Sequence, residues 1–485
     1  MGRMSGRMVG DEEYVARVRR HRPSALLPLI AGASAKYHLD TWWKSPYRKY
    51  TPWSLADAAR VSLAYGNEHR QGATEADLLR ILDMYGQLDD HFVRGTADLA
   101  SLEGFLLRTA GEQFLYQEPP YPELARSAAM LVQTTATRPA RCLRPGWEED
   151  LLGTSLSHYV RIAQLLWTSA VHSGGRFDPA CLATAGMAPV CDIIPAETIT
   201  SVTETHFVTD SAAFRKENTA ARLTADPLRR RFEYNPLRGR PFLRGYGPGY
   251  LAPVNHLIPA KASPLGIYYT GVARYGSAFA QDLGDLFEAY VGRQLALLPD
   301  ATVIPEIAYG RNRARSVDWI VITNELVLLV EVKSVRPTQH LRLATDRRLE
   351  ELARMLGHAY EQIDNTAALI RNGHEEFADI PADRPAQGLI VTMEPFHLAN
   401  ASLPDSWRPA TGVPVTVCSA GDLEYAVTIT DAPLGRLLLE RAADPQRSTY
   451  ALREALRDHA HTPNPILEAG WDSYPWKGTA PSPVQ

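Results

Sequence analysis

The stretch "SVDWIVITNELVLLVEVKS" (residues 316–334) decides how the second half of this chain folds. Two apolar runs flank the dipeptide Asn324-Glu325, and asparagine tolerates the positive φ that a tight hairpin turn needs. When strand pairs are counted outward from a two-residue turn there, Asp318 lies opposite Glu331. The stretch therefore predicts an antiparallel hairpin that ends in two facing carboxylates.

Lys333 belongs to the same face of this hairpin, because it follows Glu331 by two residues. Opposed side chains in such a hairpin lie about 4.5–5.5 Å apart, and two carboxylates that close repel unless a cation separates them. Oxygen ligands with open positions suit Mg²⁺ or Mn²⁺. An ordinary salt bridge of Lys333 at a sheet end is the alternative. It does not explain why Asp318 lies opposite Glu331, or why the strand is apolar on both faces.

These residues resemble the signature of the PD-(D/E)XK nuclease superfamily, in its nuclease-related-domain and restriction-type branches. That signature is an acid on the second core strand, here Asp318, and Glu-x-Lys on the third, here residues 331–333. The family also has a glutamate on its first core helix, which "GDLFEAYVGRQL" supplies as Glu288, and many members have a glutamine in the next helix, here Gln362. The resemblance covers about residues 270–420.

One position departs from the family pattern. Many members have a proline shortly before the acid, whereas this chain has Ser316 and Val317 there. The superfamily often lacks that proline, so the resemblance still implies a restriction-endonuclease-like α/β domain with a mixed central sheet flanked by helices.

The resemblance also implies roles for individual residues. Asp318, Glu331 and the Val332 carbonyl would bind Mg²⁺ (or Mn²⁺), and Lys333 would orient a water or stabilise developing negative charge. Glu288 would complete the metal shell, with Asp285 as its rival on the same helix. Gln362 would contact the metal water or the nucleic-acid backbone, and an ordinary polar position on the helix is the alternative.

The implied function is that of a metal-dependent nuclease that hydrolyses phosphodiester bonds, with DNA as the expected substrate and restriction or anti-phage defence as the expected setting. Two alternatives remain open on the same fold. One is a catalytically inactive nucleic-acid-binding or regulatory protein, and the other is an RNA-cleaving toxin. No P-loop, nucleophile-elbow serine or zinc-ligand spacing is present in the sequence, which disfavours ATPases, serine hydrolases and zinc enzymes.

Basic residues cluster near the predicted site and upstream of it. Phosphate contact is the functional interpretation and a solvated polar face is the alternative. The segment Ala213–Gly245 holds nine Lys or Arg against three acids, interleaved with Phe and Tyr, which is typical of nucleic-acid contact. The candidate nucleic-acid-binding residues are Arg311, Arg313, Arg315, Arg336, Arg229, Arg230 and Arg231.

The rest of the chain suggests three parts. Residues 1–265 have helical periodicity, with cap-like starts at Ser54 and Thr74 and a Pro/Gly/Arg-rich linker at 235–265. The Gly-x-Gly-x-Gly run inside that linker is typical of turns rather than of a phosphate loop. Residues 266–430 form the nuclease-like α/β domain, and 431–485 form helices and an irregular proline-rich tail.

Composition sets the general class. The 485 residues are 45% hydrophobic and 22% charged, with a net charge of −4, so any surface for nucleic acid must be local. We expect a soluble cytoplasmic protein without a membrane segment, because no apolar run is long enough to span a bilayer. A homo-oligomer or a protein partner contacted through the N-terminal helices is also expected.

Overall fold

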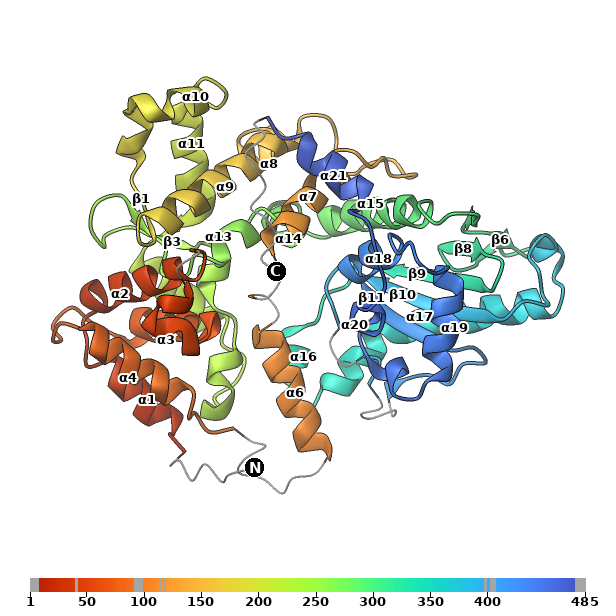
Figure 1. The fold of residues 1–485 in the computed structure, drawn as a ribbon, viewed down its shortest axis with the longest axis horizontal. Coiled ribbons are helices and arrows are strands. Elements are labelled where there is room, and N and C mark those ends of the chain that lie inside the picture. Colours follow the sequence, from red (N-terminus) through yellow and green to blue (C-terminus); the bar gives the residue numbers. More distant parts are fainter. Residues whose placement is uncertain are drawn as a thin grey trace.

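The computed structural model describes residues 8–39, 42–90, 99–113, 116, 119–396, 399–401 and 407–475. The chain is mostly helical and contains two small sheets, so the expected α/β class is confirmed at that level. The N-terminal helices gather at one end of the molecule, and the larger sheet with its helices lies at the other (Figure 1). No helix of the described residues is long and apolar enough to cross a bilayer.

Residues up to Tyr275 are mainly helical, as predicted. Thr74 caps its helix through a capping box with Asp77, whereas the expected start at Ser54 is wrong, because Thr51 caps that helix three residues earlier. The helices are α1 (Asp11–Val18), α2 (Pro23–Lys36), α3 (Pro52–Tyr65), α4 (Glu75–Tyr85), α6 (Leu99–Gln113), α7 (Pro120–Leu131), α8 (Trp147–Leu152), α9 (Leu156–His172), α10 (Ala188–Cys191), α11 (Ala196–Val202), α12 (Ser211–Ala220), α13 (Leu257–Ala260) and α14 (Pro264–Tyr275).

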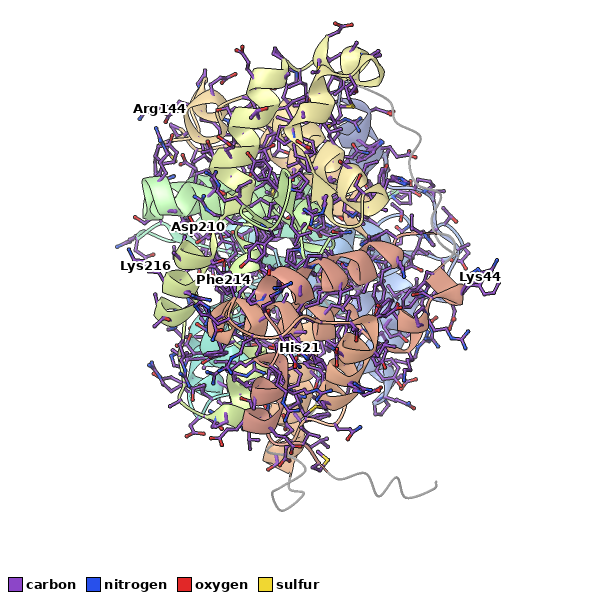
Figure 2. The ribbon with its side chains drawn as sticks, turned by 90° about the vertical axis from the view of Figure 1, so that its left-hand side faces the viewer. His21, Lys44, Arg144, Asp210, Phe214 and Lys216 are labelled. Atoms are coloured by element: carbon purple, nitrogen blue, oxygen red, sulfur yellow. The ribbon has the colours of Figure 1, made fainter. Side chains whose placement is uncertain are left out.

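Helix α12 shows how these helices divide core from surface. Phe214 is fully buried in a core cluster with side chains of α2, α3 and α4, while Lys216, two residues further on, is exposed (Figure 2). This apolar cluster is what holds the N-terminal helices together.

The segment expected as a linker, 235–265, is instead part of this core. It carries β3 (Phe242–Leu243) and β4 (Tyr250–Leu251), which join β1 (Arg176–Phe177) and β2 (Val208–Thr209) in a sheet of order β1-β4-β3-β2. Its apolar side chains are buried, which an exposed linker would not allow. The glycines between β3 and β4 do form turns, since Gly245, Gly247 and Gly249 have φ of 89°, 108° and 63°.

The larger sheet has five strands in the order β11-β10-β9-β8-β5. Strand β9 is central, parallel to β10 and antiparallel to β8, and the outer pairs are parallel for β10 with β11 and antiparallel for β5 with β8. The expected mixed sheet is therefore present. Its strands are β5 (Thr302–Pro305), β8 (Trp319–Ile322), β9 (Val327–Lys333), β10 (Ala386–Thr392) and β11 (Val415–Ser419), and a separate hairpin joins β6 (Ala308–Tyr309) to β7 (Ala314–Arg315).

Strand β9 is apolar on both faces because a helix covers each face. Leu328 and Val330 lie in the same core cluster as Phe287 of α15 (Ser277–Leu295). Leu329 lies in a second cluster with Ile363 of α17 (Arg348–Arg371), and the short α16 (Gln339–Arg342) precedes α17. These are the helices expected to carry Glu288 and Gln362.

The register of the β8–β9 hairpin is as predicted. Trp319 pairs with Val330 and Ile320 with Leu329. The Thr323 N–H donates to the Leu326 carbonyl at 3.0 Å, which closes the two-residue turn. The positive φ expected at Asn324 is absent. The Thr323 hydroxyl instead accepts hydrogen bonds from the N–H groups of Glu325 and Leu326.

The two halves of the chain share one core across residue 265. The cluster that holds Phe287 and Val330 also contains side chains of α7 and α9. Four helices complete this end of the chain: α18 (Ala420–Ala426), α19 (Leu434–Ala443), α20 (Leu452–Leu456) and α21 (Pro465–Asp472). The proline-rich tail, expected to be irregular, instead contains a helix at 465–472, because Trp471 and its neighbours are buried against α7. Residues 476–485 lie outside the described part.

A buried ion pair joins α7 to α18. Arg126 donates from Nε and Nη2 to the Glu424 carboxylate at 2.5 and 2.7 Å, and the Tyr290 hydroxyl donates to the same carboxylate at 2.7 Å. Both charged side chains are at most 5% exposed. The pair therefore fixes the N-terminal helices to the body that holds the larger sheet.

Replacing Arg126 by Met should lower the free energy of unfolding by about 3–5 kcal/mol, because Glu424 would stay buried without its cation. Urea denaturation at pH 7 measures the loss. The double variant Arg126→Met/Glu424→Met should recover much of it, since no buried charge is left unpaired and Glu123, the other partner of Arg126, is partly exposed. A double variant less stable than Arg126→Met alone would contradict this account.

Candidate active site

The hairpin brings Asp318 and Glu331 together at the end of β8 and β9. Asp318 immediately precedes β8, one position outside the Trp319–Val330 pair. Its Oδ2 accepts the Val332 N–H at 2.7 Å, so the Asp318 carboxylate is bound to the β9 backbone at the residue after Glu331. The Glu331 side chain is 2% exposed. Two acids thus face each other where water screens them poorly.

Lys333 shares this face, as the two-residue spacing predicted. Its Nζ donates to Glu331 Oε1 at 2.5 Å and to Gln362 Oε1 at 3.4 Å. Gln362 comes from α17, so that helix supplies a third polar group to the end of β9. The strand therefore ends in a compact set of Asp318, Glu331, Lys333 and Gln362.

Glu288 approaches the set from α15, on the other face of the sheet. Its backbone carbonyl accepts the Trp319 indole N–H at 3.1 Å, next to Asp318 in the chain. Gly292, one helical turn on, has no side chain, and a Cβ there would lie 2.2 Å from the Trp319 ring. The helix can therefore lie close enough to β8 for the Glu288 and Asp318 charges to interact.

The rival acid on α15, Asp285, is already paired. It accepts from Arg138 at 3.0 Å and from Arg141 at 2.9 Å, and both arginines come from the loop after α7. Asp282, one turn earlier, accepts three backbone N–H bonds from the same loop, which keep its pKa well below the ordinary value although burial opposes them. These two acids fasten the loop to the helix rather than face the end of the hairpin.

Burial and mutual repulsion set the protonation of the three candidate acids. Burial first, and then the neighbouring Asp318 charge, raise the pKa of Glu331 to about 8, although Lys333 opposes the rise. Burial also raises the pKa of Asp318, against the Val332 N–H. Burial and the Asp318 charge raise the pKa of Glu288 to about 7. A cation placed between these acids would relieve both the desolvation and the repulsion.

The residues fit a divalent cation, although the fit is incomplete. Glu331 Oε2 is buried and has no hydrogen-bond partner, an arrangement that leaves a ligand oxygen unsatisfied. Within the described residues, however, no three His, Cys, Asp or Glu side chains form a ready metal-binding cluster. Asp318, Glu331 and the Val332 carbonyl would hold the ion, and Glu288 would join only by moving its side chain.

Two charged residues near the acids carried no recognisable sequence signal. The Arg138 charge lowers the pKa of both Asp318 and Glu288, and the Glu306 charge raises the pKa of both. Arg138 is 180 positions before Asp318 in the sequence and reaches the site only because its loop is fastened to α15. Neither position could be assigned from local pattern.

The predicted phosphate contacts near the hairpin divide into two groups. Arg311, Arg313 and Arg315 are exposed around the β6–β7 turn, and Arg315 also pairs with Glu306. Arg336 is partly buried, with its guanidinium carbon 3.7 Å from the ring centroid of Tyr268. The three exposed arginines are therefore the better placed for a polyanion.

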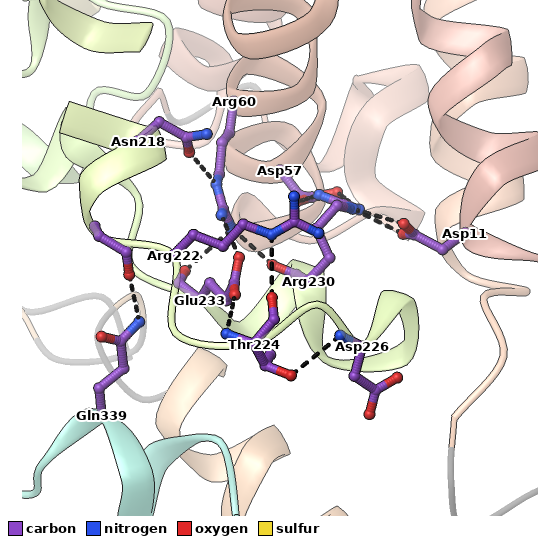
Figure 3. Close-up of polar contacts among 11 residues, drawn as sticks. Asp11, Asp57, Arg60, Asn218, Arg222, Thr224, Asp226, Arg230, Glu233 and Gln339 are labelled. Atoms are coloured by element: carbon purple, nitrogen blue, oxygen red, sulfur yellow. Dashed lines mark hydrogen bonds and ion pairs between the residues drawn. The ribbon is translucent and has the colours of Figure 1, made fainter. Parts of the chain in front are cut away.

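The prediction for Arg230 is wrong. Its guanidinium donates to both oxygens of Asp57 at 2.7 and 2.9 Å and to Asp11 at 2.8 and 3.0 Å, and the side chain is 5% exposed (Figure 3). The Arg231 guanidinium stacks on the Phe232 ring, and its Nη2 lies 3.6 Å from Asp90 Oδ2. Arg229 Nε lies 3.5 Å from Asp226 Oδ2. This arginine run holds the N-terminal helices together, which leaves Arg230 unable to reach nucleic acid.

Comparisons of the chain with protein-family models, with curated proteins and with solved structures find no match. What the chain does must therefore be argued from the geometry at the end of β8 and β9.

The raised pKa of Glu331 predicts how stability depends on pH. The unfolded glutamate loses its proton near its ordinary pKa, whereas the folded one keeps it to about pH 8, so this group destabilises the fold progressively between those pH values. Glu331→Gln removes the effect. In EDTA, we expect its unfolding free energy to exceed that of the wild type by roughly 1–3 kcal/mol at pH 8.5 and by much less at pH 5.

Denaturation of both proteins at pH 5, 7 and 8.5 measures this difference. Mg²⁺ should reduce it at pH 8.5, because an ion bound to the ionised Glu331 stabilises only the wild type. The exposed Glu350 supplies a matched control, since Glu350→Gln should show no such dependence on pH. A Glu331→Gln advantage that is the same at every pH would contradict the assignment.

Proposed function

We propose that the chain is a divalent-metal-dependent nuclease of the PD-(D/E)XK type that hydrolyses phosphodiester bonds in DNA. The observation that carries the proposal is the convergence of the buried Glu331, the half-buried Asp318 and Lys333 at the end of adjacent strands. Helix α15, the three strands β5, β8 and β9, helix α17 and strand β10 follow one another in the order that the resemblance implies. Restriction or anti-phage defence is part of this proposal by analogy alone.

Each residue has a task in this proposal. Asp318 and Glu331 would hold Mg²⁺ or Mn²⁺, and the ion would supply Lewis-acid stabilisation of negative charge on the phosphate. Lys333 would add a positive charge beside the scissile phosphate, and Gln362 limits the directions in which the Lys333 ammonium can point. Glu288, with a pKa of about 7, can take up or release a proton near neutral pH.

The exposed arginines of the β6–β7 hairpin support a nucleic-acid substrate. Arg311 and Arg313 lie at its turn, seven and five positions before Asp318, and Arg313 has a φ of 52°, a conformation found in tight turns. Such a basic hairpin next to the acids would contact backbone phosphates without reading bases.

A cleavage panel tests the proposal directly. Plasmid, linear duplex, single-stranded DNA and RNA are incubated with Mg²⁺, Mn²⁺ or EDTA. We expect metal-dependent cleavage of DNA, and a loss of about 10²–10³-fold in rate for Lys333→Ala and for Glu331→Ala, because both remove charge stabilisation in the transition state. Glu350→Ala, at an exposed position of α17, should cleave like the wild type.

The alternatives separate cleanly in this panel. Cleavage of RNA alone would favour an RNA-directed toxin, and binding without cleavage under every metal would favour an inactive binding protein. Cleavage that survives Glu331→Ala would place the chemistry elsewhere.

Arg138 should act as a positioning residue for the acids. Because its charge lowers the pKa of Asp318 and Glu288, Arg138→Ala should raise both. We therefore expect the acid limb of the pH–rate profile to move to higher pH. Arg144→Ala, an exposed arginine in the same loop, is the control. An unshifted profile together with an unchanged rate would remove Arg138 from the site.

A further inference from the structure

A cavity of about 520 Å³ lies between the N-terminal helices and the part of the chain that holds the larger sheet. Residues of α6 and α13 form one side of it, and the segments 337–342 and 393–396 form another. Its volume falls in the range of roughly 300–1,000 Å³ that is usual for small-molecule sites. Asp318, Glu331 and Lys333 are not part of its wall, so this cavity is distinct from the candidate active site.

The wall contains cations that lack carboxylate partners. Neither Arg238 nor Lys261 forms an ion pair with any described carboxylate, whereas Arg342 in the same wall pairs with Glu394. The Lys261 ammonium donates to Thr270 Oγ1 at 2.9 Å, and burial lowers its pKa to about 8. Burial and the nearby Arg342 charge lower the pKa of Arg238. An anion in the cavity would offset the cost of burying these charges.

A second part of the wall is aromatic and neutral. The imidazole rings of His38 and His256 lie 4.3 Å apart between centroids, and Trp167 packs against His38 at 5.3 Å. Burial lowers the pKa of His38 to about 4, so the ring is neutral at physiological pH. His38 Nε2 and His256 Nδ1 are buried, and neither has a hydrogen-bond partner among the described residues. Because neither nitrogen is accessible from the cavity, these rings offer a ligand aromatic surface rather than hydrogen bonds, which suits a base.

We propose that this cavity binds a small nucleoside phosphate, with the phosphate against Arg238 and the base or ribose against His38 and His256. Inorganic phosphate alone would leave the aromatic part of the wall without a partner. A neutral aromatic compound would leave Arg238 in the wall without an anion. A nucleoside phosphate satisfies both parts of the wall with one molecule.

The cavity is linked to the candidate active site by a short piece of chain. Three residues, 334–336, separate Lys333 from Pro337, which is in the cavity wall. The Arg336 guanidinium lies 4.5 Å from the ring centroid of Tyr269, another wall residue. A ligand that binds more tightly to one conformation of residues 334–337 favours that conformation. Because Lys333 directly precedes this segment, its position would change as well. This regulatory role rests on the proposed nuclease function, but the binding itself does not.

Isothermal titration of the full chain with AMP, ADP, ATP and GMP tests the binding, with adenosine and inorganic phosphate as separate arms. We expect at least one nucleotide to bind in the micromolar range, and adenosine and phosphate to bind at least about 10-fold more weakly. Arg238→Ala should weaken the nucleotide at least about 10-fold, because it removes a charge-assisted hydrogen bond. Arg436→Ala, an exposed arginine on α19 outside the cavity, should bind like the wild type.

A second variant covers the case in which Arg238→Ala fails to fold. Tyr269 is 50% exposed, so Tyr269→Leu should fold normally while it removes a ring from the cavity wall, and it should weaken the nucleotide several-fold. Failure of all four nucleotides to bind at about 1 mM, or equal binding of inorganic phosphate, overturns the proposed site. Nucleotide binding that neither variant weakens also overturns it.

The cleavage assay, run with and without saturating nucleotide, tests the regulatory role. A change in rate whose half-maximal nucleotide concentration rises several-fold in Tyr269→Leu supports it. An active nuclease whose rate ignores bound nucleotide overturns the regulation while the binding site stands. A chain that binds nucleotide and never cleaves overturns the proposed nuclease function and again leaves the site in place, so the two failures are distinguishable.

Discussion

The facing carboxylates of Asp318 and Glu331 are the constraint on which the half of this molecule with the larger sheet depends. Two acids this close repel, and the fold tolerates them only because their positions are imposed by stronger forces. The β9 backbone is hydrogen-bonded to strands on both sides, and its apolar side chains are covered by α15 and α17. The burial of Leu328, Leu329 and Val330 thus supplies the free energy that holds Glu331 where it is unfavourable. Charges that a stable sheet holds close together at one end are typical of a functional site and not of a hydrophobic core.

The register of the hairpin could be predicted because it depends on neighbours in sequence. The turn at 324–325, the period of two along each strand and the apolar runs together leave one pairing that buries both faces, and Asp318, Glu331 and Lys333 followed from it. The turn conformation could not be predicted from Asn324, since Thr323 provides the hydrogen bonds that a positive φ would otherwise have favoured. Local pattern therefore gave the position of the charges more securely than the details of the turn.

The arginines could not be assigned, because their roles depend on distant partners. Arg230 and Arg311 both lie in basic runs, yet the first meets Asp57 across 173 positions while the second is exposed. Composition records only the charge of such residues, and burial decides whether that charge is available. The same reasoning applies to Arg138, whose approach to the acids depends on the hydrogen bonds that Asp282 accepts from its loop. Long-range ion pairs set these positions, and no periodicity in the sequence encodes them.

The shared core explains why a long N-terminal part accompanies a compact candidate active site. Arg126 and Glu424 join α7 to α18, Arg138 reaches the acids from the loop after α7, and the cavity takes its wall from both halves of the chain. An independent accessory domain would need none of these contacts. The Arg138 charge contributes to the electrostatics of Asp318, after burial, the Val332 N–H, Lys333 and Glu306. A change in how the halves pack would therefore alter the charge balance at the end of β9. The N-terminal helices are therefore part of the candidate site's environment, and control of the proposed chemistry can act through packing without a separate moving domain.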